Sequence, residues 1–466
     1  MSDEPTTLLI LGASGDLTSR LLLPGLGSLL AAEPERRIRV VGADRAEMSQ
    51  EDWEATVRTA LEGAEVPTER TEELLSTVDY HQADLMESDQ LAALFADLQA
   101  PLVVYFALPP QVSVKVCALL EGVDLPQATR LALEKPFGHD GASARELNEQ
   151  LLRVVPESHI HRIDHFLGVN TVLNLIGLRF ANRLLQPVWS CEHIERVEIV
   201  YDETLALEGR AGYYDGAGAL KDMIQSHLLQ ILAFFAMETP ASVDAEEMQP
   251  LKAQVMRATR LWADDPATAS RRARYTAGQV EGRDIPDYTS EEGVDPDRET
   301  ETLAELVLEV RNARWSGVPF VLRSGKALGT AAKRVEVTFR QPDHVPTGLE
   351  DTPGPDRLVL ELKPGAVMLD LSMNAEGDPF ALERKELQAE LGKARMLPYG
   401  EVLAGIFDGN MLLSIRGDVA LECWRIVEPA LQAWAQGDVE LQEYPAGSSG
   451  PEGWGPPPDE GEDSGT

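Results

Sequence analysis

The first forty-five residues carry the pattern that most restricts the fold of this chain. The apolar run Thr7–Leu11 predicts a buried strand, and the turn Gly12-Ala13-Ser14-Gly15 follows it directly. An apolar, helix-like stretch continues through Leu30, and Ile38–Val41 predicts a second strand. A strand, a glycine turn, a helix and a further strand in this order are typical of a βαβ unit. The N-terminal part is therefore predicted to be a doubly wound, Rossmann-type α/β domain.

The same alternation of helices and strands continues along the chain. Trp53–Leu61 and Leu91–Leu98 have helical spacing, whereas Leu102–Leu108 and Leu131–Leu133 predict further buried strands. We expect this dinucleotide-binding domain to cover residues 1–165.

Beyond this boundary the pattern changes to alternating polar and apolar residues with few helices between them. The alternating runs are Arg196–Tyr201, Leu303–Val310, Val335–Arg340, Leu358–Leu362 and Val367–Leu371. This arrangement predicts a mainly antiparallel sheet, hence an α+β substrate and oligomerisation domain over residues 166–450. Within it, Leu220–Met237 predicts an amphipathic helix and the polar Asp264–Arg298 a surface excursion. The tail 451–466, rich in Gly, Pro and acidic residues, is predicted to be disordered.

Charge and cysteine content exclude several classes of function. The formal net charge of −37 argues against binding to nucleic acid or to an anionic membrane surface. Either a halophilic source or a well-solvated surface accounts for it. No run reaches the roughly 18 apolar residues of a membrane span. Cys117, Cys191 and Cys423 are far apart and lack metal-ligand spacing, so we expect reduced thiols, a cytoplasmic location and no metal.

The glycine turn is a candidate cofactor site. A strand that enters a glycine turn before a helix presents backbone N–H groups to a pyrophosphate. The second strand ends in Asp44-Arg45. A carboxylate there accepts hydrogen bonds from ribose hydroxyls and favours NAD, whereas a guanidinium pairs with a 2′-phosphate and favours NADP. Asp44 can instead cap the next helix. We expect NADP, with NAD possible.

Five segments together resemble one known family. Arg162-Ile163-Asp164-His165-Phe166-Leu167-Gly168-Val169 resembles the active-site signature of glucose-6-phosphate dehydrogenases, R-I-D-H-[YF]-L-G-K. The other segments similar to family motifs are Gly12–Leu17, Glu134-Lys135-Pro136-Phe137-Gly138, Arg210–His227 and Trp315–Lys326. The resemblance runs from Leu8 to about Gly450 and is to an actinobacterial-like variant in which Val169 replaces the phosphate-pocket lysine.

The resemblance implies a reaction and a set of site residues. It implies oxidation of C1 of glucose 6-phosphate to 6-phosphogluconolactone, the entry to the oxidative pentose phosphate pathway, by a cytoplasmic homodimer or homotetramer. The implied substrate ligands are His165, Lys135, Glu203, Asp222 and Lys326. The implied cofactor ligands are Gly12, Ser14, Gly15, Asp16, Leu17, Asp44, Arg45, Ala107, Pro109 and Lys135.

His227 is the candidate general base. It lies on the apolar stripe of the helix predicted at Leu220–Met237, where a lone histidine is often only a satisfied core residue. A dehydrogenase, however, needs a base of near-neutral pKa to take the hydroxyl proton as hydride leaves the carbon. The resemblance implies this role for His227, with Asp164 as its orienting partner.

The phosphate pocket departs from the family pattern. Phe166 lacks the hydroxyl of the family's tyrosine, and Val169 lacks the charge of its lysine. Counting from Lys326 puts Ala331 at the next basic position, and Lys333 fits only with a two-residue insertion. Other candidate cations are Arg162, Arg179 and Arg183. Three interpretations remain open: a relocated cation with the same substrate, another sugar or sugar phosphate, or a non-catalytic regulatory homologue.

Overall fold

The computed structural model describes residues 5–209, 211–349, 354–363, 365–378 and 380–454. The chain forms two compact units, each discontinuous in sequence. The first consists of residues 1–183, 233–257 and 392–425, and the second of residues 184–232, 258–391 and 426–466. The predicted domain boundary at 165/166 stays a prediction. Of the predicted tail, residues 451–453 lie in bends and turns, whereas 455–466 lie outside the described residues.

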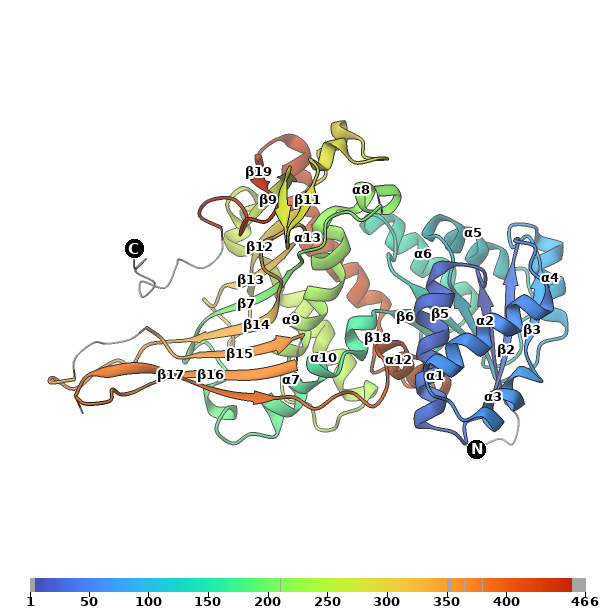
Figure 1. The fold of residues 1–466 in the computed structure, drawn as a ribbon, viewed down its shortest axis with the longest axis horizontal. Coiled ribbons are helices and arrows are strands. Elements are labelled where there is room, and N and C mark those ends of the chain that lie inside the picture. Colours follow the sequence, from blue (N-terminus) through green and yellow to red (C-terminus); the bar gives the residue numbers. More distant parts are fainter. Residues whose placement is uncertain (1–4, 210, 350–353, 364, 379, 455–466) are drawn as a thin grey trace. The chain divides into compact units, whose positions relative to one another are not determined.

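The first unit is built on a seven-stranded sheet (Figure 1). Its strands, in spatial order, are β18 (Ser414–Ile415), β6 (Ile160–Ile163), β5 (Arg130–Glu134), β4 (Leu102–Phe106), β1 (Thr6–Leu11), β2 (Ile38–Asp44) and β3 (Asp79–Gln82). All neighbours pair in parallel except β18, which is antiparallel to β6. The strand order reverses between β1 and β4, which makes their carboxyl ends a topological switch point.

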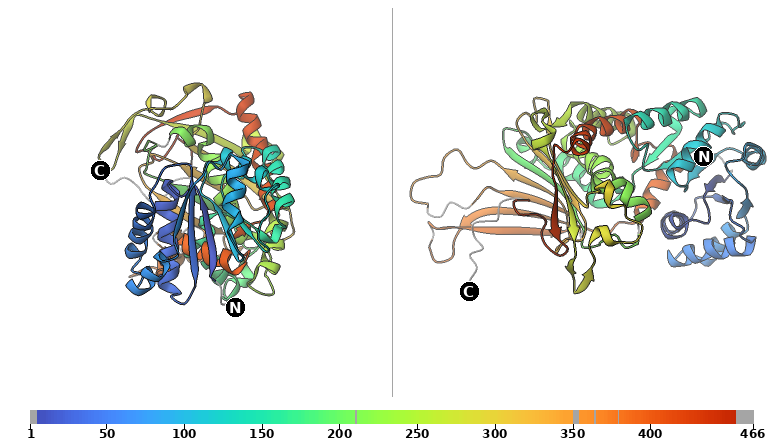
Figure 2. Two further views of the ribbon diagram at one scale, coloured as in Figure 1. Left: turned by 90° about the vertical axis from the view of Figure 1, so that its right-hand side faces the viewer. Right: turned by 90° about the horizontal axis from the view of Figure 1, so that it is seen from above.

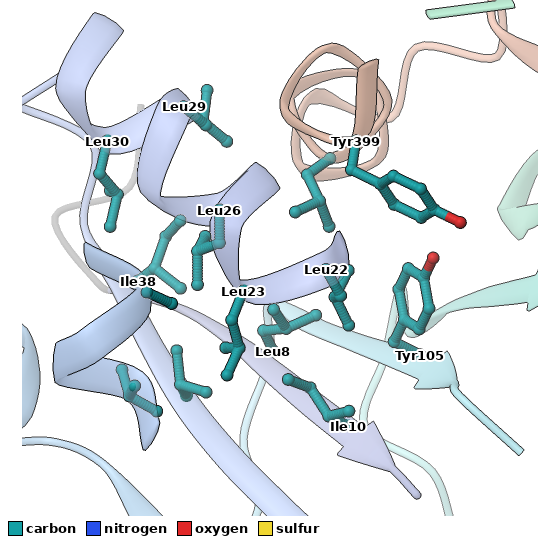
Figure 3. Close-up of a cluster of buried hydrophobic side chains, with 14 of the residues drawn as sticks. Leu8, Ile10, Leu22, Leu23, Leu26, Leu29, Leu30, Ile38, Tyr105 and Tyr399 are labelled. Carbon is teal, nitrogen blue, oxygen red and sulfur yellow. The ribbon is translucent and has the colours of Figure 1, made fainter. Parts of the chain in front are cut away.

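Helices cover both faces of this sheet (Figure 2). The helices of the first unit are α1 (Leu23–Ala32), α2 (Gln50–Gly63), α3 (Thr68–Leu75), α4 (Ser88–Ala96), α5 (Pro110–Leu120), α6 (Gly141–Val154), α7 (Asn170–Phe180), α10 (Ala245–Ala258) and α12 (Pro398–Asp408). A buried cluster joins β1 residues Leu8 and Ile10 to α1 and α12 (Figure 3). The contact with α12 is so close that a Cβ on Gly25 would lie 2.4 Å from the Cβ of Tyr399.

The second unit is built on a ten-stranded mixed sheet. Its strands, in order, are β17 (Leu382–Glu390), β16 (Gly365–Asn374), β15 (Arg357–Leu362), β14 (Ala332–Phe339), β7 (Ile194–Asp202), β13 (Phe320–Gly325), β12 (Leu303–Val310), β9 (Ser270–Thr276) and β19 (Leu441–Pro445), with β8 (Thr259–Leu261) also paired to β12. Only β7–β13 and β9–β19 pair in parallel. Figure 1 shows β16 and β17, in orange, as a long hairpin at one edge. The predicted fold class, a parallel α/β part followed by a mainly antiparallel part, is confirmed.

The prediction that Asp264–Arg298 is only a surface excursion is wrong. Strand β9 lies inside the sheet, and Ala273 and Tyr275 are fully buried. The sequence pattern did not predict β9 because three of its seven residues are arginines, which are rarely buried. Arg272 itself is buried, because its guanidinium donates to the backbone carbonyls of Trp434 and Val439. The rest of the segment contains α11 (Pro266–Ala269) and the small hairpin β10 (Gly278–Val280) and β11 (Arg283–Ile285).

The helix predicted over Leu220–Met237 is confirmed in extent but has two parts. Residues of α8 (Ala211–Ala219) lead into a π-helix, η5 (Leu220–Leu228), and α9 (Leu229–Ala236) continues from it. Within the second unit, η5 packs against β7, β12 and β13. The long helix α13 (Gly417–Gln436) contributes to both units. In the described ranges no helix is both long and apolar enough to cross a membrane.

Candidate active site

The glycine turn is held against the ends of two neighbouring strands. Gly12 adopts φ +90°, and a Cβ there would lie 2.3 Å from the carbonyl oxygen of Ala107, so only glycine fits. The Gly12 N–H donates to the carbonyl of Ala43 at 2.8 Å. The turn therefore lies between the carboxyl ends of β2 and β4, where Ala107 and Pro109 also lie. Asp16 and Leu17 begin the helix that follows.

Asp44 is the last residue of β2 and is tied to this turn. Its carboxylate accepts hydrogen bonds from Ser14 Oγ at 2.8 Å and from the Ser14 N–H at 3.2 Å. It also accepts from the Ala46 N–H at 3.3 Å, but the alternative that Asp44 caps the next helix is wrong, because Ser49 is the N-cap of α2. Arg45 is exposed beside it. A glycine turn, a strand-end carboxylate and an exposed guanidinium at a switch point fit a nicotinamide dinucleotide.

Lys135 follows the carboxyl end of β5 and is partly buried. The Lys135–Pro136 peptide bond is cis, one of the two alternatives that the sequence suggested. The indole Nε1 of Trp424 donates to the Phe137 carbonyl at 3.1 Å and so fixes the turn after it. The residue before it, Glu134, accepts hydrogen bonds from the hydroxyls of Tyr105 and Tyr399. Burial raises the pKa of Glu134 to about 7, although both phenols and Lys135 oppose this rise.

Asp164 and His165 lie where β6 ends and the short 3₁₀ turn η3 (His165–Gly168) begins. Asp164 is 1% exposed, and its Oδ1 accepts the Phe166 N–H at 2.9 Å. The His165 ring stacks on the ring of Tyr399, with centroids 5.6 Å apart and planes 14° apart. Phe166 meets the same imidazole by its edge at 5.1 Å. Asp164 thus has a capping role in addition to its predicted role in orienting the base.

Two of the three arginines suggested as replacements for the missing lysine serve the fold instead. Arg162 is fully buried and donates to Glu157 at 2.8 Å and to Asn148 at 3.0 Å. Arg179 is 4% exposed, and its guanidinium donates to the backbone carbonyls of Phe234 and Met237. Arg183 is exposed. Neither buried guanidinium is available to a phosphate.

In the second unit, two lysines meet one carboxylate. Strands β7 and β13 are parallel with Asp202 opposite Gly325, so the next residues, Glu203 and Lys326, are neighbours. Lys326 Nζ lies 2.9 Å from Glu203 Oε2, and Lys333 Nζ lies 3.4 Å from Oε1. The three side chains are 15–19% exposed. Burial lowers the pKa of Lys333, but its bonds to Tyr201 and Glu203 outweigh this and raise it.

Lys333 reaches Glu203 because of strand register. It faces Tyr201 across the antiparallel β14–β7 pair, and its Nζ lies 4.4 Å from the centre of that ring. Counting along the sequence from Lys326 places the family's next basic residue at Ala331, which has no charge. The structure brings Lys333 to the cluster instead.

Asp222 and His227 share the π-helix η5. On an α-helix of about 3.6 residues per turn, residues five apart lie about 140° apart around the axis. In a π-helix the hydrogen bonds join residues five apart, as between the Leu229 N–H and the Ile224 carbonyl, so Asp222 and His227 lie about one turn apart. His227 is 1% exposed, and Asp222 Oδ1 accepts from Tyr213 Oη at 3.3 Å.

The start of η5 depends on a buried acid that the sequence analysis did not select. Glu301 Oε1 accepts the Leu220 N–H at 2.9 Å, and a Cβ on Gly218 (φ +70°) would lie 2.3 Å from that oxygen. Burial raises the pKa of Glu301 to about 7, while the Leu220 bond lowers it. The sequence feature that could have identified Glu301 is its position in Thr300-Glu301-Thr302, directly before an apolar strand.

Comparison with known proteins gives one consistent result. Family models match residues 9–174 ("Glucose-6-phosphate dehydrogenase, NAD binding domain") and residues 176–455 ("Glucose-6-phosphate dehydrogenase, C-terminal domain"). A glucose-6-phosphate 1-dehydrogenase of Gluconobacter oxydans is 39% identical over 470 residues, covering 96% of this chain and 95% of the relative. A solved glucose-6-phosphate dehydrogenase in complex with glucose-6-phosphate has a TM-score of 0.85 at 30% identity, covering 97% and 96% of the two chains. A second structure, from Mycobacterium avium, has a TM-score of 0.81 at 31% identity, covering 96% of each chain.

Proposed function

The chain belongs to the glucose-6-phosphate dehydrogenase family, and we propose that it oxidises C1 of glucose 6-phosphate with His227 as the general base. The observation that carries this proposal is the 39% identity over nearly the whole of both chains. The paired lysines at Glu203 support it, because they supply positive charge to a chain with a net charge of −37.

The reaction transfers a proton and a hydride from the same alcohol. His227 takes the C1 hydroxyl proton while hydride leaves C1, and the carbon–oxygen double bond of the lactone forms. A nicotinamide ring, when bound, accepts the hydride. The family resemblance assigns Asp164 as the orienting partner of His227, and a carboxylate in that role fixes the imidazole tautomer and stabilises the imidazolium.

Acidic and basic side chains divide the recognition of the sugar. Glu203 and Asp222 accept hydrogen bonds from sugar hydroxyls, and Lys135 orients the reacting end. His165, Lys326 and Lys333 bind the phosphate. A charge-assisted hydrogen bond is worth about 1.5–3 kcal/mol, so Lys333 offsets the loss that Val169 implies.

The chain uses NADP and accepts NAD. Exposed Arg45 pairs with a 2′-phosphate, while Asp44, already bonded to Ser14 and Ala46, is oriented toward the turn. Without the 2′-phosphate, the carboxylate of Asp44 accepts from the ribose hydroxyl. The residues that hold the dinucleotide are Gly12, Ser14, Gly15, Asp16, Leu17, Asp44, Arg45, Ala107, Pro109 and Lys135.

The active form is a cytoplasmic homodimer or homotetramer. The edge strand β17 supports a homo-oligomer, since Leu387 on it is 51% exposed and Met373 on the neighbouring β16 is 43% exposed. The three cysteines are unpaired thiols, as expected in the cytoplasm. Light scattering coupled to size exclusion measures the mass of the assembly, and a mass of one chain contradicts this proposal.

A second candidate substrate follows from Val169 and Phe166, which remove two phosphate ligands of the family pattern. The test measures formation of NADPH and NADH by absorbance with glucose 6-phosphate, glucose and other hexose phosphates. We expect the highest kcat/KM with glucose 6-phosphate and NADP. A higher value with another sugar supports the second candidate, and no reduction with any sugar supports a non-catalytic homologue.

A further inference from the structure

Two tyrosines from distant parts of the chain bind the same carboxylate. Tyr105 lies on β4 and Tyr399 on the first turn of α12, and both hydroxyls donate to Glu134 at the end of β5. Figure 3 shows the two phenol oxygens directed toward one another. Tyr105 is fully buried and Tyr399 is 6% exposed. Glu134 thus accepts hydrogen bonds from two phenols.

The first turn of α12 has little freedom to move relative to this carboxylate. A Cβ on Gly25 of α1 would lie 2.4 Å from Tyr399 Cβ, and a Cβ on Gly168 of η3 would lie 2.4 Å from the Pro398 carbonyl oxygen. Backbones that approach this closely fix the position of Tyr399 against both α1 and η3.

The ring of Tyr399, fixed in this way, stacks on the ring of His165. The planes of the phenol and the imidazole are nearly parallel, at 14° to one another, and Phe166 contacts the imidazole by its edge. We propose that Tyr399, tethered through its hydroxyl to Glu134, is a positioning residue that sets the plane of the His165 ring for binding the substrate phosphate. This inference rests on the proposed function, in which His165 is a phosphate ligand.

Packing alone gives no reason for a hydroxyl at this position. A phenylalanine fills nearly the same volume as Tyr399. Burial of a carboxylate such as Glu134 costs free energy unless hydrogen bonds compensate it, so the fold alone would be served as well by apolar residues at both positions. The acidic and basic groups that face Glu134 are Tyr105, Tyr399, Lys135 and Asp164. The polar cluster therefore lies directly beside Lys135, Asp164 and His165.

The test compares sugars with and without the phosphate. In Tyr399→Phe, the stack is kept and the hydrogen bond to Glu134 is lost, so the KM for glucose 6-phosphate is expected to rise about three- to tenfold, less than the loss of a direct charge-assisted bond to the phosphate. The kcat with glucose 6-phosphate and the kcat/KM for glucose stay unchanged, since glucose makes no use of His165. Tyr105→Phe, which leaves the stacked pair untouched, gives a smaller shift in the same direction.

A double-mutant cycle separates positioning from a general loss of structure. In a His165→Asn background, Tyr399→Phe is expected to have no further effect on the KM for glucose 6-phosphate. The matched control is Tyr275→Phe in the second unit, which removes a hydroxyl that donates to Glu291 at 2.8 Å and accepts the Leu207 N–H at 3.3 Å, and which leaves every constant unchanged.

The remaining outcomes distinguish a failure of the positioning role of Tyr399 from a failure of the proposed function. Equal losses with both sugars, additive effects in the His165→Asn background, or no effect of Tyr399→Phe in an active enzyme overturn the positioning role alone. A wild-type chain that does not turn over glucose 6-phosphate overturns the proposed function itself.

Discussion

The ammonium group of Lys333 lies 3.4 Å from the carboxylate of Glu203, although 130 positions separate the two residues in sequence. Lys326 binds the other oxygen of the same carboxylate at 2.9 Å. The pair of cations around one anion leaves a net positive charge at the ends of β7 and β13. In the proposed function, this charge takes the place of the family's lysine, which Val169 replaces.

Lys333→Met is expected to raise the KM for glucose 6-phosphate by about one to two decades, because it removes a charge-assisted bond of about 1.5–3 kcal/mol. The kcat changes little, and the kcat/KM for phosphate-free glucose is unaffected. Steady-state kinetics with both sugars check this, with the exposed Lys393→Met as the matched control. An equal loss for glucose shows that Lys333 only supports Glu203.

His227→Asn is expected to lower kcat by about 10²- to 10⁴-fold, since the C1 hydroxyl loses its proton acceptor. The KM for the sugar changes modestly, because asparagine is similar in size. Single-turnover absorbance measurements give the rate of the chemical step. Retained turnover assigns the base to another residue.

The sequence predicted the parts of the fold and site that depend on local pattern. Strand ends such as Asp44 and helix faces such as that of His227 follow from periodicity and turn chemistry within about ten residues. Strand β9 was missed because Arg272, a charged side chain, is buried by backbone carbonyls that come from residues far along the chain. Lys333 was left open for the same kind of reason, since its place depends on the register of β14 against β7.

The π-helical turn was beyond prediction for a different reason. The apolar residues of this segment recur at the spacing of an α-helix, so the sequence pattern predicts an α backbone and gives no sign of the wider π turn. The start of η5 is anchored by Glu301, which binds the Leu220 N–H and excludes any side chain at residue 218. That anchor is a tertiary contact between residues 81 positions apart.

Arg45→Leu is expected to raise the KM for NADP by about tenfold or more and to leave the KM for NAD unchanged, because the guanidinium contacts only the 2′-phosphate. Steady-state kinetics with the two cofactors measure the ratio. Arg37→Leu, on the segment before β2, is the control. Parallel losses with both cofactors contradict the assignment.

Glu301→Gln is expected to stabilise the protein above pH 7. The pKa of Glu301 is about 7 in the fold and near its usual value of 4.5 in the unfolded chain, so the folded state binds more protons between these values. Its contribution to stability therefore falls as pH rises from 4.5 through 7, by up to about 3 kcal/mol. Glutamine keeps the acceptor for the Leu220 N–H and removes the charge.

Urea denaturation should show a gain in the free energy of unfolding of Glu301→Gln at pH 8 that vanishes near pH 4.5. The control Glu246→Gln, at an exposed position on α10, should show no gain. A gain of equal size at both pH values contradicts this cause.

Lys252→Met is expected to stabilise the protein at neutral pH. The Lys252 side chain on α10 is fully buried, its Nζ lies 4.8 Å from the centre of the Phe234 ring, and it has no hydrogen-bond partner among the residues that the structure describes. Burial lowers the pKa of Lys252 to about 8, although Asp164 acts in the opposite direction. Because the folded-state pKa lies below the unfolded value of 10.5, the cost of burying the ammonium charge is fully present below pH 8 and declines as pH rises from 8 toward 10.5.

Methionine fills a similar volume without a charge, so the free energy of unfolding of Lys252→Met should exceed that of the wild type by about 3 kcal/mol at pH 7, and the difference should shrink by pH 9.5. Urea denaturation at pH 6, 7 and 9.5 measures it, and a variant less stable than the wild type at pH 7 means that the attraction to Asp164 outweighs the cost of burial.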